Sequence, residues 1–100
     1  MSINMTTSDE GSRVTITVAG KFDFQLYEEF RASYADTAGD GVDYVVDLSN
    51  TDYLDSSALG MLLLLREHAG GESSSIAITR ASPDVRKILD VANFGKLFKL

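Results

Sequence analysis

The sequence has no cysteine and no tryptophan, and it has one proline and one histidine among 100 residues. The absence of cysteine excludes disulfides, cysteine-ligated metal centres and thiol chemistry. Basic residues are also scarce, since 9 lysines and arginines face 15 acidic residues and leave a formal net charge of −6. Nucleic acids and anionic membranes reward clustered positive charge, so neither is an expected partner. A basic or neutral protein suits this composition better.

Long apolar runs are missing as well. The longest, at residues 61–65, is far too short to cross a membrane. Residues 1–7 lack the basic start and the apolar stretch of a signal peptide. We therefore expect no direct membrane insertion and a cytoplasmic location. The 44% of hydrophobic residues is typical of a globular protein, and we expect a single domain over residues 1–100.

Strands are predicted where apolar residues alternate with polar ones or form short runs. Residues 13–19 alternate cleanly, and a polar turn at 8–12 predicts a hairpin with a short first strand over 3–7. The apolar run at 44–48 is typical of a central strand that is covered on both faces. A further strand is expected at 75–79.

Helices are predicted between and after these strands. Asp23 can cap a helix whose apolar residues Phe24, Tyr27, Phe30 and Tyr34 recur three and four apart. Ser82, Pro83 and Asp84 are typical of a helix N-terminus and predict the last helix of the chain. An apolar tail is expected to return to the sheet, and it contains Phe94, Leu97, Phe98 and Leu100.

The expected order is therefore strand, strand, helix, strand, helix, strand, helix and tail. Strands that alternate with helices favour a parallel sheet with right-handed crossovers. The first hairpin adds an antiparallel edge. The predicted fold class is α/β, with a mixed, mostly parallel sheet, an N-terminal antiparallel hairpin and helices packed on it.

The most informative segment runs from Asp55 through two serines into a leucine-rich helix that ends at Gly70. Ser56 or Ser57 is expected as the N-cap, where a hydroxyl accepts from orphan backbone N–H groups. The positive end of the helix dipole would also tolerate a phosphate there.

This helix is apolar all round, which a helix with a single buried stripe does not need. We expect one side to face the core, with Ala58, Met61, Leu62, Leu65 and Ala69. The remaining leucines, Leu59, Leu63 and Leu64, then need a second cover. That cover is either another layer of the same domain or a partner protein.

Other groups of polar residues give only weak support for a metal site or a catalytic site. Asp47, Asp52 and Asp55 follow the central strand and could bind Mg²⁺, but turn-forming acids at a loop are the simpler interpretation. His68 is expected on the surface near a helix C-terminus, and it lies too far along that helix from Ser57 for a nucleophilic pair. We therefore expect no metal, no cofactor and no enzymatic activity.

Several motifs together carry a family resemblance. They are Val18–Asp23, Val45–Ser49, Tyr53–Gly60, Ser82–Val85 and Phe94–Gly95. With these motifs the chain resembles, from about Val14 to Leu97, the STAS domain, and specifically the small stand-alone anti-sigma factor antagonists of bacteria. The Tyr53–Gly60 block is the specific part of the match.

The resemblance implies a phosphorylation-controlled switch. The serine directly after the aspartate, here Ser56 with Ser57 as the alternate, would be phosphorylated by a serine-kinase anti-sigma factor of the histidine-kinase-like ATPase fold. The unphosphorylated form would bind that kinase and release its target, and a PP2C-like serine phosphatase would reset the switch. The resemblance places Asp23, Asp55, Ser56, Ser57, Ala58 and Leu59 in the docking face. Ala58 stands where many members have glycine.

Three alternatives remain. Within the family, the chain could be a non-phosphorylated accessory subunit of a lipid-transport ATPase. From another class, an acyl carrier protein is also small and acidic with an Asp-Ser pair, but it is all-helical. A receiver domain phosphorylated at Asp47 is a weaker fit, because Asp47 is the one element of its pattern in place.

Overall fold

The computed structural model describes residues 2–8, 11–37 and 41–100. Its strands form one sheet of four, in the order β1-β2-β3-β4. The strands and helices are β1 (Ile3–Ser8), β2 (Arg13–Phe22), η2 (Phe24–Leu26), α1 (Tyr27–Ala35), β3 (Asp43–Leu54), α2 (Ser56–His68), η3 (Gly71–Ser73), β4 (Ser75–Thr79), α3 (Pro83–Val91) and η4 (Phe94–Lys96). The predicted order of strands and helices is confirmed.

The sheet is mixed, as predicted. β1 pairs with β2 antiparallel, while β2 with β3 and β3 with β4 are parallel. Residues 9–10 of the expected hairpin turn lie outside the described residues. A four-stranded sheet also rules out the acyl carrier alternative, since those proteins are all-helical.

β3 is longer than the predicted 44–48. It runs from Asp43 to Leu54 because its second half pairs with the end of β2, where the register shifts on either side of Ala19 and Gly20. Gly20 has a φ of 82°, which a residue without Cβ adopts at little cost. As a result, β2 and β3 end side by side, with Phe22 opposite Leu54.

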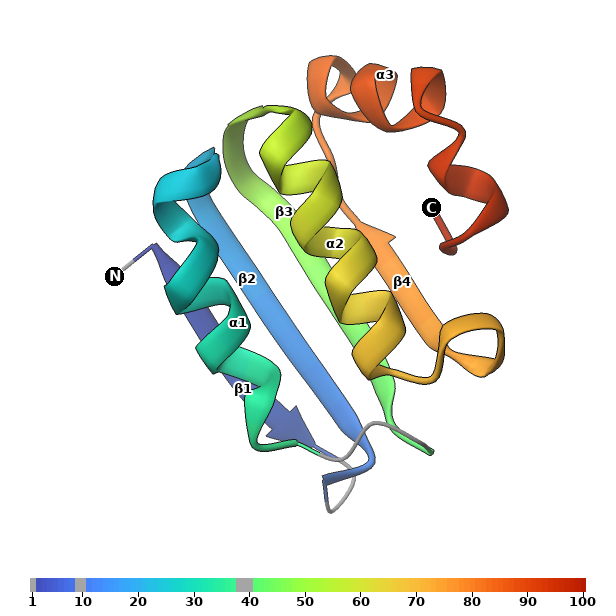
Figure 1. Cartoon of the computed structure of the whole chain (residues 1–100). Helices are drawn as coiled ribbons and strands as arrows, with labels where there is room; N and C mark the ends of the chain where they lie inside the picture. The colour runs from blue at the N-terminus through green and yellow to red at the C-terminus, as the bar shows by residue number, and fades with distance from the viewer. Residues whose placement is uncertain (1, 9–10, 38–40) are drawn as a thin grey trace.

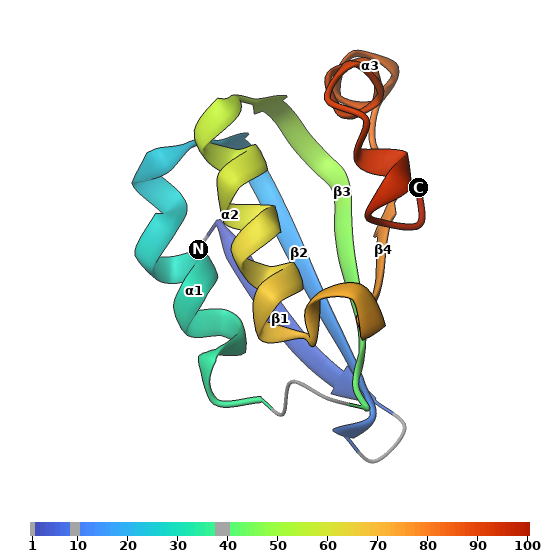
Figure 2. The same cartoon turned by 45° about the vertical axis from the view of Figure 1, so that its right-hand side comes forward.

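Two of the three α-helices in the described part of the chain cover one face of the sheet (Figures 1 and 2). α1 and α2 lie over that face, and α3 lies beyond the carboxyl ends of β3 and β4. The predicted core side of α2 is confirmed, because Ala58, Met61, Leu62, Leu65 and Ala69 are all buried. Leu63 and Leu64 remain exposed, at 39% and 47%. No helix in the described part of the chain is long and apolar enough to span a bilayer.

The apolar tail returns to the sheet, as predicted. Lys99 bridges Ala77 in parallel: its carbonyl accepts from Ile78 N at 2.7 Å, and its N–H donates to Ile76 O at 2.9 Å. Phe94 and Phe98 are buried and stack with ring centroids 5.1 Å apart. The tail therefore pairs with the outer edge of β4.

His68 is half-buried, so the expectation of a surface role was wrong. Its ring lies 5.0 Å from that of Tyr34 and 6.3 Å from that of Tyr44. Its Nε2 is 3.1 Å from the carbonyl oxygen of Thr37. The aromatic contacts between α1, β3 and α2 draw this end of the helix inward, which its position near a helix C-terminus did not reveal.

Asp47 is tied into the structure rather than presented for chemistry. It is 7% exposed, and its carboxylate accepts from Ser49 N at 2.9 Å and from Arg80 Nη2 at 2.8 Å. Burial acts to raise the pKa of Asp47, but the hydrogen bonds from Ser49 and the Arg80 guanidinium outweigh it and hold the pKa below its ordinary value. This placement argues against the receiver alternative.

Candidate functional site

The ends of β2 and β3 bring two separated acids together. Asp23 directly follows Phe22, and Asp55 directly follows Leu54, which is the register partner of Phe22. Asp55 N donates to Phe22 O at 3.4 Å, so the start of α2 is joined to the end of β2. The fold therefore brings Asp23, which the resemblance assigns to the docking face, beside the start of α2.

The helix cap differs from the prediction. Asp55, not Ser56 or Ser57, is the N-cap of α2: it has extended backbone, with φ −111° and ψ −176°, and its Oδ1 accepts from Ala58 N at 3.0 Å. Aspartate caps a helix as well as serine does. Asp23 caps η2 in the same way, accepting from Gln25 N at 3.0 Å, as expected of a capping residue.

Because Asp55 supplies the cap, Ser56 opens the helix with an exposed side chain. Among the described residues, its hydroxyl makes no hydrogen bond. Ser57 is half-buried and faces the α1 side of α2, where it borders a groove. Ser56 is therefore the more accessible of the two hydroxyls.

Ala58 cannot contribute a side chain to a docking face, contrary to the expectation. It is fully buried, and its N–H is held by Asp55. Its turn of the helix faces the sheet, as the predicted core side requires. The next residue, Leu59, is partly buried and reaches the surface on the α3 side.

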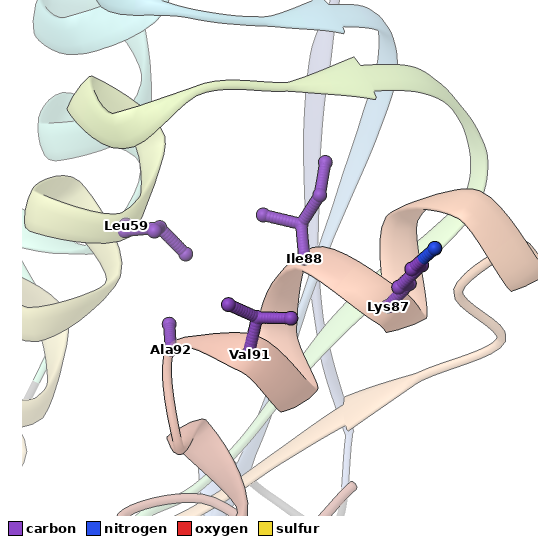
Figure 3. A pocket seen from close by; sticks show the side chains of 5 residues that line it. All are labelled: Leu59, Lys87, Ile88, Val91 and Ala92. Carbon is purple, nitrogen blue, oxygen red and sulfur yellow. The ribbon is translucent and has the colours of Figure 1, made fainter.

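An apolar groove lies between α2 and α3 (Figure 3). Figure 3 shows Leu59 facing Ile88, Val91 and Ala92 across the gap, with Lys87 beside them. The groove has a volume of about 330 Å³. Val91 is 77% exposed, which leaves a large apolar side chain in water at the groove's edge.

A second apolar groove lies on the other side of α2, with a volume of about 290 Å³. Its lining residues are Phe24, Tyr27, Ser57, Gly60, Met61 and Leu64. Phe24 was expected on the buried side of an amphipathic helix, but it lies in the short η2 and is 67% exposed. Its ring stacks on that of Tyr27 at 5.5 Å. Apolar surface therefore borders the first turns of α2 on both sides.

Val91 was not singled out from the sequence. The available signal was that Val91 is apolar but does not lie on the side of α3 that Val85 and Leu89 bury. Its exposure could not be assigned without knowing what α3 packs against. The sequence therefore indicated the first turn of α2 but not the groove beside it.

The acids near this site are not arranged as a metal centre. Among residues 2–8, 11–37 and 41–100, no three histidine, cysteine, aspartate or glutamate side chains gather as ligands. Asp47 is paired with Arg80, and Asp55 caps α2. Asp23 and Asp55 instead give the start of α2 a negative character, because the described part of the chain pairs neither of them with a cation.

Comparison with known families agrees with this architecture. The model described as "Mlab, STAS domain" matches residues 5–99. The chain belongs to the STAS domain family. A STAS-domain containing protein, PA14_20770 of Pseudomonas aeruginosa (strain UCBPP-PA14), is 52% identical over 100 residues, covering 100% of this chain and 99% of that protein.

Several solved structures share the fold at low sequence identity. The anti-sigma factor antagonist SpoIIAA in its unphosphorylated form has a TM-score of 0.77 at 19% identity, covering 96% of this chain and 84% of that one. An anti-sigma factor antagonist from Mycobacterium paratuberculosis has a TM-score of 0.72 at 24% identity, with coverage of 97% and 83%. The phosphorylated form of SpoIIAA from Bacillus has a TM-score of 0.69 at 17% identity, with coverage of 96% and 87%.

Proposed function

We propose that this STAS protein is an anti-sigma factor antagonist that acts as a phosphorylation-controlled binding switch. The unphosphorylated form binds a serine-kinase anti-sigma factor of the histidine-kinase-like ATPase fold and thereby releases that factor's target. Phosphorylation of Ser56 abolishes the binding, and a PP2C-like serine phosphatase restores it. The chain has no catalytic activity of its own in this scheme.

One observation carries the proposal. Ser56 is exposed at the N-terminus of α2, its hydroxyl makes no hydrogen bond among the described residues, and an apolar groove lies on each side of this helix. An exposed hydroxyl is accessible to a kinase. Apolar grooves on both sides provide area that a partner can bury, at roughly 25 cal/mol per Å². The anti-sigma factor antagonists of the same fold, one of them solved in a phosphorylated form, support this reading.

The electrostatics of the site favour release after phosphorylation. A phosphate adds about −1.5 to −2 charges. The α2 dipole returns about 0.3 to 1 kcal/mol to the free protein. Enclosing an unmatched dianion beside Asp55 in an interface would cost several kcal/mol. A net penalty of about 3 kcal/mol weakens binding roughly a hundredfold.

Asp55, Asp23, Ser57 and Leu59 take supporting roles in this scheme. Asp55 orients the start of α2 by capping it, and its charge lies next to the hydroxyl. Asp23 adds a second negative charge beside Asp55. Ser57 borders the groove toward α1, and Leu59 supplies part of the groove toward α3.

The test is phosphorylation in vitro. The purified chain is incubated with ATP and a histidine-kinase-like serine kinase from the source genome, and the product is mapped by mass spectrometry. We expect phosphate on Ser56, no phosphate on a Ser56→Ala variant and normal phosphorylation of a Ser57→Ala variant. The same kinase, immobilised, should bind the parent and Ser56→Ala but bind Ser56→Asp at least tenfold more weakly.

Two results would refute the switch. One is the absence of phosphate from Ser56 with every such kinase of the genome. The other is equal affinity of the kinase for the parent and for the protein phosphorylated on Ser56.

A second candidate function is the non-phosphorylated accessory subunit of a lipid-transport ATPase. It is kept because the matching family model is described as Mlab, not as an anti-sigma factor antagonist. Two measurements separate the candidates. An accessory subunit would co-purify with a transport ATPase equally well from cells that express the parent or Ser56→Ala, and it would carry no phosphate in either case.

A further inference from the structure

The two outer edges of the sheet differ in whether another segment pairs with them. The outer edge of β4 is closed by the chain's own tail, through the hydrogen bonds between Lys99 and residues Ile76 and Ile78. The outer edge of β1 has no such strand in the described part of the chain. Figure 1 shows β1 at the side of the sheet opposite β4.

The register determines which backbone groups lie on the free edge. Ala19 N donates to Ser2 O at 2.8 Å, so Ser2 and Ala19 form a hydrogen-bonded pair. Hydrogen-bonded and non-hydrogen-bonded pairs alternate in antiparallel strands, so Ile3, Met5 and Thr7 direct their N–H and C=O groups away from β2. Ile3 N donates to the Glu29 carboxylate at 2.9 Å, which confirms this direction. No bond to the outward groups of Met5 and Thr7 occurs among the described residues.

Beyond the Glu29 carboxylate at Ile3 N, this edge lacks the usual protection against pairing. Natural proteins guard edge strands with charged side chains, proline, bulges or a covering segment. β1 has the sequence Ile-Asn-Met-Thr-Thr-Ser, with no charge and no proline, and it pairs with β2 without a register shift. An edge with these properties is a template for another strand.

We propose that β1 pairs antiparallel with β1 of a second copy of this chain. A two-fold axis at Thr6 places Met5 opposite Thr7 of the second copy. That register uses the free N–H and C=O groups of Met5 and Thr7 reciprocally and leaves the Ile3–Glu29 bond intact. An uncharged strand also meets itself without like-charge contacts along the ladder.

The side chains beside this edge fit the arrangement. Met5 is 37% exposed and borders a groove of about 270 Å³ between β1 and α1. The other lining residues are Ile3, Glu29, Ala32 and Ser33. The short side chains of Ala32 and Ser33 leave room for the flexible thioether of Met5 from the second copy. The interface is small, so we expect a reversible dimer.

This inference does not rest on the proposed function. The edge of β1 and the groove between α2 and α3 lie on different sides of the molecule (Figures 1 and 2).

Sedimentation or light scattering from micromolar to millimolar concentration tests association. The parent should move from the monomer mass of 10.9 kDa toward twice that value. Added salt should strengthen association, because each copy carries a formal charge of −6.

Substitutions on β1 test which residues form the interface. Met5→Lys and Thr7→Pro should stay monomeric with a parental circular dichroism spectrum. Thr7→Pro removes an outward N–H that the monomer does not use. Val91→Lys, which changes the groove between α2 and α3, should dimerise like the parent.

Cross-linking tests the register, because the chain has no natural cysteine. In a Thr6→Cys variant, the two introduced residues face each other as a non-hydrogen-bonded pair, with Cα atoms roughly 4.5 Å apart. Mild oxidation should join them. Asn4→Cys is the matched control, since it lies on the same strand face but too far from its own copy for a disulfide. A parent that stays monomeric at millimolar concentration, or equal cross-linking of both variants, overturns the proposal.

Discussion

Asp55 serves two structural purposes at one position. Its carboxylate caps α2 by accepting from Ala58 N, and its own N–H joins the helix to the end of β2. The cap frees the hydroxyl of Ser56 from a structural hydrogen bond. A single side chain thus keeps the candidate phosphorylation site both ordered and accessible.

This capping role predicts different effects for two substitutions. Asp55→Ala should lower the free energy of unfolding by about 1 kcal/mol, because the N–H of Ala58 loses its acceptor. Asp55→Asn should stay close to the parent, since asparagine also caps. Urea unfolding measures both. If Asp55→Ala unfolds at the same urea concentration as the parent, the cap does not stabilise α2.

Asp47 predicts a pH dependence of stability. Its pKa lies below the ordinary value in the folded state, so its carboxylate stabilises the fold at neutral pH, and this contribution is lost as the pH falls below about 4. The free energy of unfolding of Asp47→Asn should therefore fall less steeply with acidification than that of the parent. Asp90→Asn is the control, because Asp90 forms an exposed ion pair with Arg86 that adds little. Parallel acid profiles of parent and Asp47→Asn would contradict this account.

At the scale of elements, the relation of α3 to α2 creates the apolar groove. α3 buries Val85 and Leu89, which leaves Val91 at the edge with Leu59 opposite. A helix that packs with one stripe and exposes an apolar residue beside it offers a contact surface without weakening the core.

If the proposed kinase docks on this groove, Val91→Lys should weaken its binding by about tenfold or more, because the substitution removes an apolar contact worth roughly 1.5 kcal/mol and adds a charge. Thermal unfolding should stay near the parent's, since the Val91 side chain is 77% exposed. Met5→Lys is the matched control, as another exposed apolar residue changed to lysine, and it should bind the kinase normally. Equal affinity of parent and Val91→Lys would remove the groove from the docking surface.

At the scale of the whole molecule, the strands and helices share one layer of buried side chains. Leu62 and Leu65 of α2 are fully buried, as are Ile16 of β2 and Val46 of β3. A shared core of this kind favours cooperative unfolding.

We therefore predict that the chain unfolds as the single domain expected from its length. Far-ultraviolet circular dichroism and tyrosine absorbance should give coincident urea transitions. Leu62→Ala should lower the free energy of unfolding by about 2–5 kcal/mol and shift both signals together. Separate transitions for the two probes would show independent parts.

The sequence predicted most of the fold because burial follows the period of each element. The alternation at 13–19 and the inward side of α2 could be identified without a structure, since each depends on neighbours along the chain. The second half of β3 could not, because residues 49–52 are polar and the strand continues through them by pairing with β2. The choice of Asp55 over Ser56 as cap was equally hidden, since both residue types cap helices well.

The sequence alone determined the order of the elements and the buried side of α2, and it supplied the motif that makes Ser56 a candidate phosphorylation site, because these depend on local spacing and residue type. Tertiary structure decided that Ser56 is exposed while Ala58 is buried, that Phe24 and Val91 border grooves, and that one sheet edge is closed while the other is open. Those features arise between segments far apart in the chain. Their contacts depend on how helices and strands pack, and no local pattern encodes that packing.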